Sequence, residues 1–151
     1  MPGIRRLPFF RFSLMVIRPV SDAVAHRTST AWSALKRERL ILQAPPAPLR
    51  LLIDHHLARA GVNPELPIVL NRLDTIVGMV AAGQGIGIIP SFAQPVCQHR
   101  NVVMTPLVNP VVPVDFYQIR NRGRKLSPTV DEFTLFLQGY IARWAGRAGI
   151  P

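Results

Sequence analysis

Apolar residues recur along this chain in short runs that are bounded by proline, glycine and polar turn residues. Short runs that are rich in β-forming residues are typical of buried strands. The pattern therefore predicts strands at residues 14–17, 40–42, 66–70, 86–89 and 114–119.

Between these runs, apolar positions repeat every three or four residues, as they do on one face of a helix. The first such helix covers residues 49–60. A second begins at Asp74, whose side chain can cap it, and ends at Gly83. The last begins at Ser127 as N-cap and continues to Trp144.

Strands and helices thus alternate along most of the chain, which predicts an α/β fold with parallel strands and right-handed crossovers. Two segments are less regular. A short helix is expected to start within residues 30–35. Residues 91–113 are rich in turn formers, with an extended piece near residues 102–104.

Composition is that of a folded chain with a real core. The 151 residues include 48% hydrophobic and 17% charged side chains, and the mean hydropathy is +0.21. This length fits one domain or two small lobes, and this composition excludes a disordered polar chain. A single cysteine excludes a disulfide framework and a four-cysteine zinc site.

The net charge of +10 suggests, taken alone, a partner with negative charge such as nucleic acid or a membrane surface. The excess lies toward the two ends, however, because residues 60–119 carry a net charge of −1. Sixteen of the 18 basic residues are arginine, whereas phosphate-binding surfaces usually recruit lysine as well. The charge is therefore weak support for direct DNA contact.

The amino-terminal segment resembles a secretory signal only superficially. Arg5 and Arg6 precede apolar residues, and residues 23–25 read Ala-Val-Ala, but Arg11 interrupts the apolar run that export requires. No stretch reaches the roughly 18 apolar residues of a spanning helix. We expect a cytoplasmic protein without a membrane partner.

No convincing catalytic set is present, so we do not expect an enzyme. His55 and His56 are adjacent, which makes their side chains diverge on a helix instead of forming a metal-binding pair. Cys97 has no evident base nearby in sequence, and Ser91 lacks the flanking glycines of a nucleophile elbow. We expect no metal and no cofactor.

Gly83, Gly85 and Gly87 form a cluster that superficially suggests a dinucleotide site. A dinucleotide fingerprint follows a strand and opens a helix, whereas these glycines follow a helix and open a strand. Gly83 and Gly85 are expected to make the tight turn. Gly87 is expected to allow close approach of backbone or of a ligand to the strand.

The segment Ile76–Pro90 closely resembles the VAAGxGIxxxP signature of LysR-type transcriptional regulators. The basic loop followed by Leu126-Ser127-Pro128 and Phe133 is similar to the closing segment of the same family. The resemblance covers roughly residues 14–144.

This resemblance implies a periplasmic-binding-protein-like (type II) effector domain of two α/β lobes, with a small molecule bound in the cleft between them. Ligand closure would bend a hinge of two crossing strands, here residues 14–17 and 116–120. The family reads DNA through a helix-turn-helix, and nothing in this sequence fits that domain. DNA contact is therefore expected only through a domain missing from this chain.

The family pattern predicts a chain truncated at its amino terminus, with lobe two and the tail of lobe one. The boundaries expected are an unmatched basic segment 1–12, lobe two with its hinge strands 13–120, the closing loop and helix of lobe one 121–146, and a tail 147–151. An uncovered apolar face on the last helix would favour a homo-oligomer or instability.

Ligands of open α/β sheets bind outside the carboxyl ends of the strands, close to helix N-termini. The connections that follow the strands at residues 40–42, 66–70 and 86–89 meet this description. Free helix N–H groups there suit a carboxylate-bearing effector, although the charge of Asp74 would partly oppose one. The effector site predicted from these connections comprises Ala44, Pro45, Pro46, Asn71, Arg72, Asp74, Thr75, Ile89, Pro90, Ser91 and Phe92.

Two other functions remain open at this point. A solute-binding protein of a transport system shares the implied fold, although Arg11 argues against export. A small basic nucleic-acid-binding protein would explain the net charge.

Overall fold

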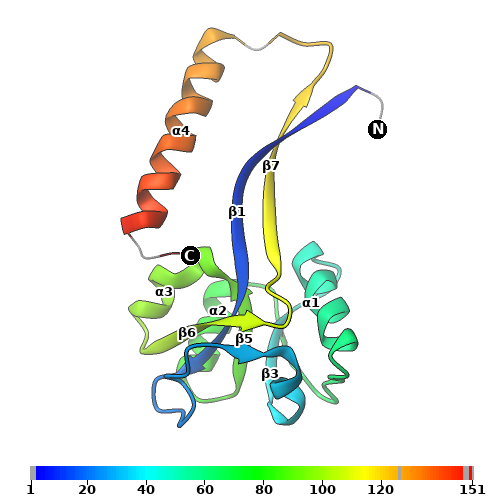
Figure 1. Ribbon diagram of the computed structural model, residues 1–151, viewed down its shortest axis with the longest axis vertical. Coiled ribbons are helices and arrows are strands. Elements are labelled where there is room, and N and C mark those ends of the chain that lie inside the picture. Colours follow the sequence, from blue (N-terminus) through cyan, green and yellow to red (C-terminus); the bar gives the residue numbers. More distant parts are fainter. Residues whose placement is uncertain (1–2, 126, 148–149, 151) are drawn as a thin grey trace. The chain divides into compact units, whose positions relative to one another are not determined.

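The structure is a computed structural model that describes residues 3–125, 127–147 and 150 (Figure 1). The chain forms two compact units. Unit 1 consists of residues 1–12 and 113–151, and unit 2 consists of residues 13–112. Leu126 of the expected closing segment lies outside the described residues, as do the remaining positions at the two ends of the chain.

Unit 2 is built on a mixed sheet. Its strands are β1 (Ile4–Pro19, which begins in unit 1), β2 (Thr30–Ala31), β3 (Leu40–Gln43), β4 (Ile68–Leu70), β5 (Ile86–Pro90) and β6 (Val102–Val108). The strand order is β2-β6-β1-β5-β3-β4. Strand β3 is parallel to both β4 and β5, whereas β1 runs antiparallel to β5 and β6. The predicted α/β class is confirmed, and the expected parallel pairing holds for only part of the sheet.

Strand β1 is longer than the sequence predicted. The apolar run at residues 14–17 is fully enclosed by the unit 2 sheet, but the strand extends back to Ile4. In unit 1 this extension pairs with β7 (Pro113–Asn121). The amino-terminal segment, for which no place in the fold was expected, is thus strand from Ile4 onward. Arg5, Arg6 and Arg11 interrupt the apolar residues of this part of the strand, so the apolar pattern did not predict a strand there.

The three long helices lie where the periodicity predicted them: α1 (Pro48–Arg59), α2 (Leu73–Ala81) and α4 (Pro128–Arg147). The cap of α2 was predicted wrongly. Arg72, not Asp74, is the N-cap residue, and no side chain bonds there as a cap. Asp74 lies inside the first turn, where its charge still interacts favourably with the helix dipole.

Two segments contain more regular structure than expected. The turn-rich segment forms the 3-10 helix η2 (Ser91–Ala93), the short helix α3 (Gln94–Gln98) and a seven-residue β6. Near residue 30, β2 precedes the 3-10 helix η1 (Trp32–Arg37). Short elements of this kind depend on tertiary partners more than on local sequence.

Helices cover both faces of the unit 2 sheet. On one face, α2 and α3 pack against alternate strand residues such as Ile41 and Ile89, with Val77 at the centre of the cluster. The intervening residues Leu40 and Leu42 are also buried, because successive side chains of a strand point to opposite faces. On that second face β3 contacts α1, and α1 contacts η1.

The turn into β5 depends on glycine. Gly83 and Gly85 have φ of +71° and +152°, and a methyl group at Gly85 would overlap the carbonyl oxygen of Arg39. That oxygen accepts the Ile86 N–H at 2.9 Å. The close approach predicted at Gly87 is also observed. It involves side chains: a β-carbon there would lie 2.9 Å from Cγ1 of Ile17.

Arg18 is a buried charge that the sequence analysis did not single out. Its side chain is 4% exposed, and its guanidinium pairs with Asp22 and Glu38 at 2.9 Å each. The Val24 amide and the Arg18 guanidinium hold the pKa of Asp22 below its ordinary value. Because these carboxylates follow β1 and η1 respectively, the cluster ties the irregular segment between them to the sheet.

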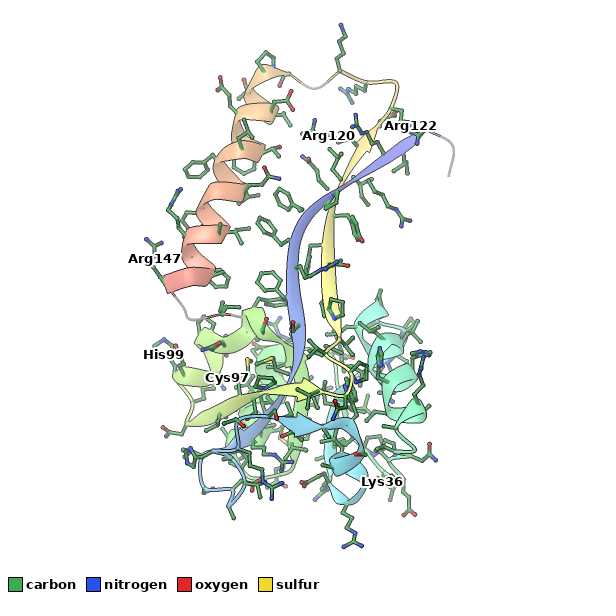
Figure 2. The ribbon with its side chains drawn as sticks, viewed as in Figure 1. Lys36, Cys97, His99, Arg120, Arg122 and Arg147 are labelled. Carbon is green, nitrogen blue, oxygen red and sulfur yellow. The ribbon has the colours of Figure 1, made fainter. Side chains whose placement is uncertain are left out.

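Unit 1 consists of the ribbon of β1 and β7 together with α4. Gln118 on β7 donates to Oγ1 of Thr134 at 3.0 Å, and Arg120 pairs with Asp131 at 3.1 Å. Arg120 lies within β7, whereas Arg122 lies in the basic loop that follows, whose residues 122–125 are exposed (Figure 2). None of the helices within the described residues is both long enough and apolar enough to cross a membrane.

We expect Gly85→Ala to lower the free energy of unfolding by about 2–3 kcal/mol, because the methyl group meets the Arg39 carbonyl in a conformation that already favours glycine. Gly83→Ala is the matched control, since its position is open and only the positive φ is unfavourable, which costs about 1 kcal/mol. Chemical denaturation measures both. Equal losses of unfolding free energy for the two variants would contradict the predicted overlap with the Arg39 carbonyl.

Replacing both carboxylates that face Arg18, as Asp22→Asn with Glu38→Gln, should lower the free energy of unfolding by about 3 kcal/mol, because a buried guanidinium is left uncompensated. Arg72→Gln breaks an exposed pair with Asp74 and should barely move the unfolding curve. Equal free energies of unfolding for the two variants would contradict a stabilising role for the cluster of Arg18, Asp22 and Glu38.

Candidate functional site

The carboxyl ends of β3, β4 and β5 meet at one edge of the unit 2 sheet. These strands are neighbours in the sheet, and Gln43 lies in register with Leu70. The Ala44 N–H donates to the Leu70 carbonyl at 2.9 Å, so the loop after β3 begins beside the end of β4. The structure therefore brings together the three connections from which the effector site was predicted.

The first connection, Ala44 with Pro45 and Pro46, leads into α1. The two prolines are exposed, and Ala44 is half-buried. Arg50 fixes this turn, because its Nη1 donates to the Gln43 carbonyl at 2.8 Å while its Nε donates to Asp54 at 2.8 Å. Sequence analysis missed Arg50. The Arg50–Asp54 spacing signals a helix-surface pair, but nothing in it shows the reach back to β3.

The second connection carries the exposed polar side chains Asn71, Arg72, Asp74 and Thr75. Arg72 Nε donates to Asp74 at 3.0 Å, and Asp74 accepts the Thr75 N–H at 3.0 Å. The Arg72 guanidinium is the main cause that holds the pKa of Asp74 below its ordinary value. An ionised carboxylate of the chain itself therefore occupies the first turn of α2, where an anionic ligand would compete with it.

Asp74 and Thr75 also line a cavity of about 310 Å³ together with Gly78, Met79 and Arg100. Arg100 lies over the glycine, since a β-carbon at Gly78 would be 3.2 Å from its Nη1. This cation follows α3 and is far from α2 in sequence. No motif connects the two, so only the fold could reveal that Arg100 borders the second connection.

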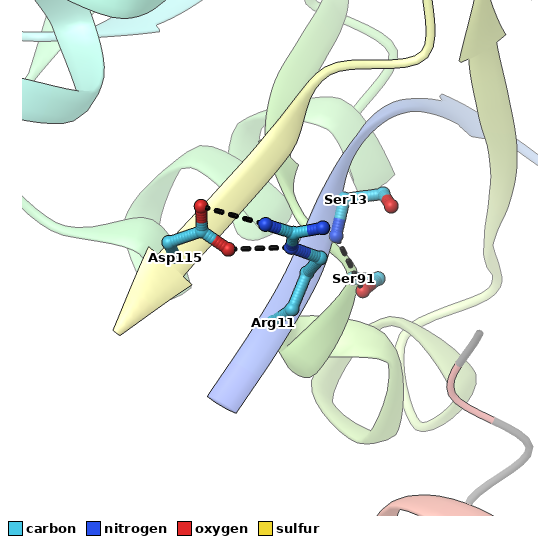
Figure 3. A network of polar contacts seen from close by, with 4 residues as sticks. All are labelled: Arg11, Ser13, Ser91 and Asp115. Carbon is cyan, nitrogen blue, oxygen red and sulfur yellow. Dashed lines mark hydrogen bonds and ion pairs between the residues drawn. The ribbon is translucent and has the colours of Figure 1, made fainter. Parts of the chain in front are cut away.

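The third connection differs from the other two because it is largely enclosed. Ile89, Pro90 and Ser91 are buried, and of its four predicted residues Phe92 alone is half-exposed. The Ser91 hydroxyl accepts the Ser13 N–H at 3.2 Å and so joins β1 to the start of η2 (Figure 3). Ser91 thus has a structural partner, a role the sequence did not indicate.

Figure 3 also shows an ion pair within unit 1. Arg11 on β1 donates to Asp115 on β7, with an Nε–Oδ1 distance of 2.6 Å. The Arg11 guanidinium lowers the pKa of Asp115. Arg11, the residue that breaks the apolar run at the amino terminus, is therefore a cross-strand partner in the ribbon.

The opposite edge of the unit 2 sheet carries a larger hollow that the sequence did not predict. It has a volume of about 480 Å³ and is lined at the amino ends of β3 and β4 by Arg39, Leu40, Asn63, Leu66 and Pro67, among others. Cavity size alone would favour this edge over the predicted one. Helix N-termini and parallel-strand carboxyl ends, which commonly bind ligands, lie at the predicted edge.

The remaining candidates for chemistry lie apart from both edges. The His56 ring lies 5.3 Å from that of Trp32, and burial, followed by the charges of His55 and Arg59, lowers the pKa of His56. Burial raises the pKa of Cys97 to about 11, so its thiol stays protonated near neutral pH. Within the described residues, no His, Cys, Asp and Glu side chains gather in a set that could hold a metal ion.

Comparison with known proteins identifies the family. The family model described as the LysR substrate binding domain matches residues 1–142, so the match includes the amino-terminal segment for which no counterpart was expected. The uncharacterized HTH-type transcriptional regulator YfeR of Shigella flexneri is 34% identical over 131 residues, which cover 86% of this chain and 42% of that protein. The chain thus spans less than half the length of this curated relative.

Solved structures show the same fold. The effector binding domain of QuiR in complex with shikimate superposes with a TM-score of 0.75 at 24% identity, over 92% of this chain and 66% of that one. The regulatory domain of CcmR from Synechocystis PCC6803 in complex with 2-PG superposes with a TM-score of 0.74 at 19% identity, over 91% of this chain and 67% of that one.

These domains have the periplasmic-binding-protein-like type II fold, as the resemblance at residues 76–90 implied. Because the family match extends over nearly the whole sequence, this chain belongs to the LysR substrate binding domain family of transcriptional regulators.

Proposed function

We propose that this chain senses a small-molecule effector at the carboxyl edge of β3, β4 and β5 and that it serves transcription regulation in a LysR-type regulator. The observation that carries the proposal is the convergence of the three connections at one edge, beside the first turns of α1 and α2. Membership in a family of effector-binding regulators favours this function over solute transport.

The proposed contacts lie mainly on the first two connections. Asn71 and Thr75 offer exposed polar groups, and Pro45 and Pro46 offer exposed apolar surface. On the third connection, the half-exposed side chain of Phe92 is the proposed contact. The buried side chains of Ile89, Pro90 and Ser91 support the edge from behind.

A carboxylate is the effector chemistry that this edge suits best. Arg72 and the first-turn N–H groups of α2 are donors that a carboxylate can use, and Arg100 adds a second cation beside Thr75. Shikimate, which QuiR binds, is itself a carboxylate. Such a ligand would compete with Asp74 for Arg72, so binding is coupled to the opening of an existing ion pair.

The proposed role is binding without catalysis, since the family consists of transcriptional regulators. It places the protein in the cytoplasm, where a regulator acts, and assigns contact with DNA to a helix-turn-helix domain outside this chain. It also includes a homo-oligomer as the working assembly.

Isothermal titration calorimetry with a panel of small carboxylates and aromatic acids, shikimate included, tests this site. We expect Asn71→Ala with Thr75→Ala to weaken the strongest binder at least about tenfold, which corresponds to about 1.4 kcal/mol. Both side chains are exposed, so the fold should be unaffected.

The matched control is Asn63→Ala, which removes an exposed amide from the opposite edge and should leave affinity unchanged. Affinity that survives the double substitution but falls with Asn63→Ala would move the site to the other end of the sheet and refute the proposal.

A further inference from the structure

The hollow at the amino ends of β3 and β4 is lined by three cations that have no ion-pair partner. Lys36 and Arg37 end η1, and Arg39 leads into β3 (Figure 2 labels Lys36). All three are exposed, and none forms an ion pair with the residues that the structure describes. Like charges that gather around one hollow repel one another, and an anionic ligand would relieve that repulsion.

The backbone holds the two arginines in place. Glu38 lies between them in an extended conformation, with φ −96° and ψ 142°, so its side chain points away from those of Arg37 and Arg39. It pairs there with the buried Arg18 at 2.9 Å. The carbonyl oxygen of Arg39 accepts the Ile86 N–H at 2.9 Å. The sheet therefore anchors this segment at two points and presents its guanidinium groups from a rigid frame.

The segment between α1 and β4 supplies the rest of the lining. Asn63 is exposed, and its side-chain amide is a further hydrogen-bond donor. Leu66 is 88% exposed, and it lines the same hollow together with Pro64 and Pro67. A ligand that has both an anionic group and an apolar body would meet donors and apolar surface in one place.

Two carboxylates also lie in the lining, Glu38 and Glu65. Because Glu38 is bonded to Arg18, it is already occupied. Glu65 is exposed and forms no ion pair with the described residues, so it would partly oppose an anion. Three cations outnumber it, which favours a ligand with more than one negative charge.

We propose that this hollow is a second binding site of unit 2 and that it takes a phosphate monoester with a small apolar body. Such a group carries about −1.5 to −2 charges at pH 7 and three acceptor oxygens, to which arginine forks donate in pairs. Lys36, one of the two lysines of the chain, adds the point charge that phosphate sites commonly recruit. The volume of about 480 Å³ suits a small-molecule site.

This inference does not rest on the effector site proposed above, because it concerns the opposite edge of the sheet and another class of ligand. A monocarboxylate has a single charge, and one exposed ion pair contributes little to binding. We therefore expect the amino edge to prefer the phosphate group and to leave carboxylates to the other edge.

Isothermal titration calorimetry of the full 151-residue chain with phenyl phosphate tests the site, with inorganic phosphate and benzoate as comparison ligands. We expect phenyl phosphate to bind at least about tenfold more tightly than either, because it alone combines a phosphate group with an apolar ring. Arg37→Gln with Arg39→Gln should weaken it at least about tenfold. The matched control is Arg27→Gln with Arg59→Gln, which removes two exposed cations of unit 2 from outside the lining and should leave the affinity unchanged.

Two further variants separate this site from the effector edge. Asn63→Ala should weaken phenyl phosphate binding and spare the carboxylates, whereas Asn71→Ala with Thr75→Ala should do the reverse. Each replaced side chain is exposed, so the fold should be retained.

Four results would overturn the inference. Phenyl phosphate that does not bind, or that responds to Asn71→Ala with Thr75→Ala and not to the arginine pair, would exclude the hollow as its site. Equal losses from the arginine pair and from the control pair would indicate a general effect of net charge. Inorganic phosphate that binds as tightly as phenyl phosphate would show that the apolar surface takes no part and would contradict the assigned ligand class.

Discussion

Strand β5 is enclosed on both edges and both faces, and the arrangement of unit 2 depends on that enclosure. It pairs with β1 on one side and β3 on the other, and all five of its residues are buried. The chain must enter this strand directly from α2, so the turn has to be tight. Gly85 makes the entry possible beside the Arg39 carbonyl, and Gly87 leaves space for Ile17 and Ile76. The glycines of the signature therefore serve the close packing of β5.

The same strand order accounts for the position of the candidate site. Because β3 is parallel to β4 and β5, the connections that follow all three emerge at one edge. A buried, hydrogen-bonded sheet can hold exposed loop residues such as Asn71 and Thr75 in fixed positions, which is how rigid scaffolds commonly present binding groups. Arg50 and Ser91 add hydrogen bonds that fix the first and third connections.

Sequence patterns predicted the buried elements of unit 2 well, because enclosed strands need continuous apolar runs and covered helices need an apolar face. They failed where an element is stabilised by partners that are distant in sequence. The first half of β1 is held by pairing with β7 and by Arg11–Asp115, which no local pattern reveals. Arg18 is a charged residue in an otherwise apolar strand segment. Only the fold shows that Asp22 and Glu38 pair with its buried guanidinium. The candidate site residues were predicted from their positions after three strands and near helix N-termini, whereas the position of Arg100 beside the second connection needed the structure.

Effector binding is proposed to occur at the carboxyl edge of the unit 2 sheet. The most direct measurement is a two-dimensional ¹H–¹⁵N NMR titration of the labelled chain with the carboxylate that binds most tightly. The largest amide shifts should fall on Ala44, Asn71 and Thr75, while Asn63 and Leu66 at the opposite edge stay unchanged. Shifts concentrated on Asn63 and Leu66, with Asn71 and Thr75 unmoved, would contradict the claim.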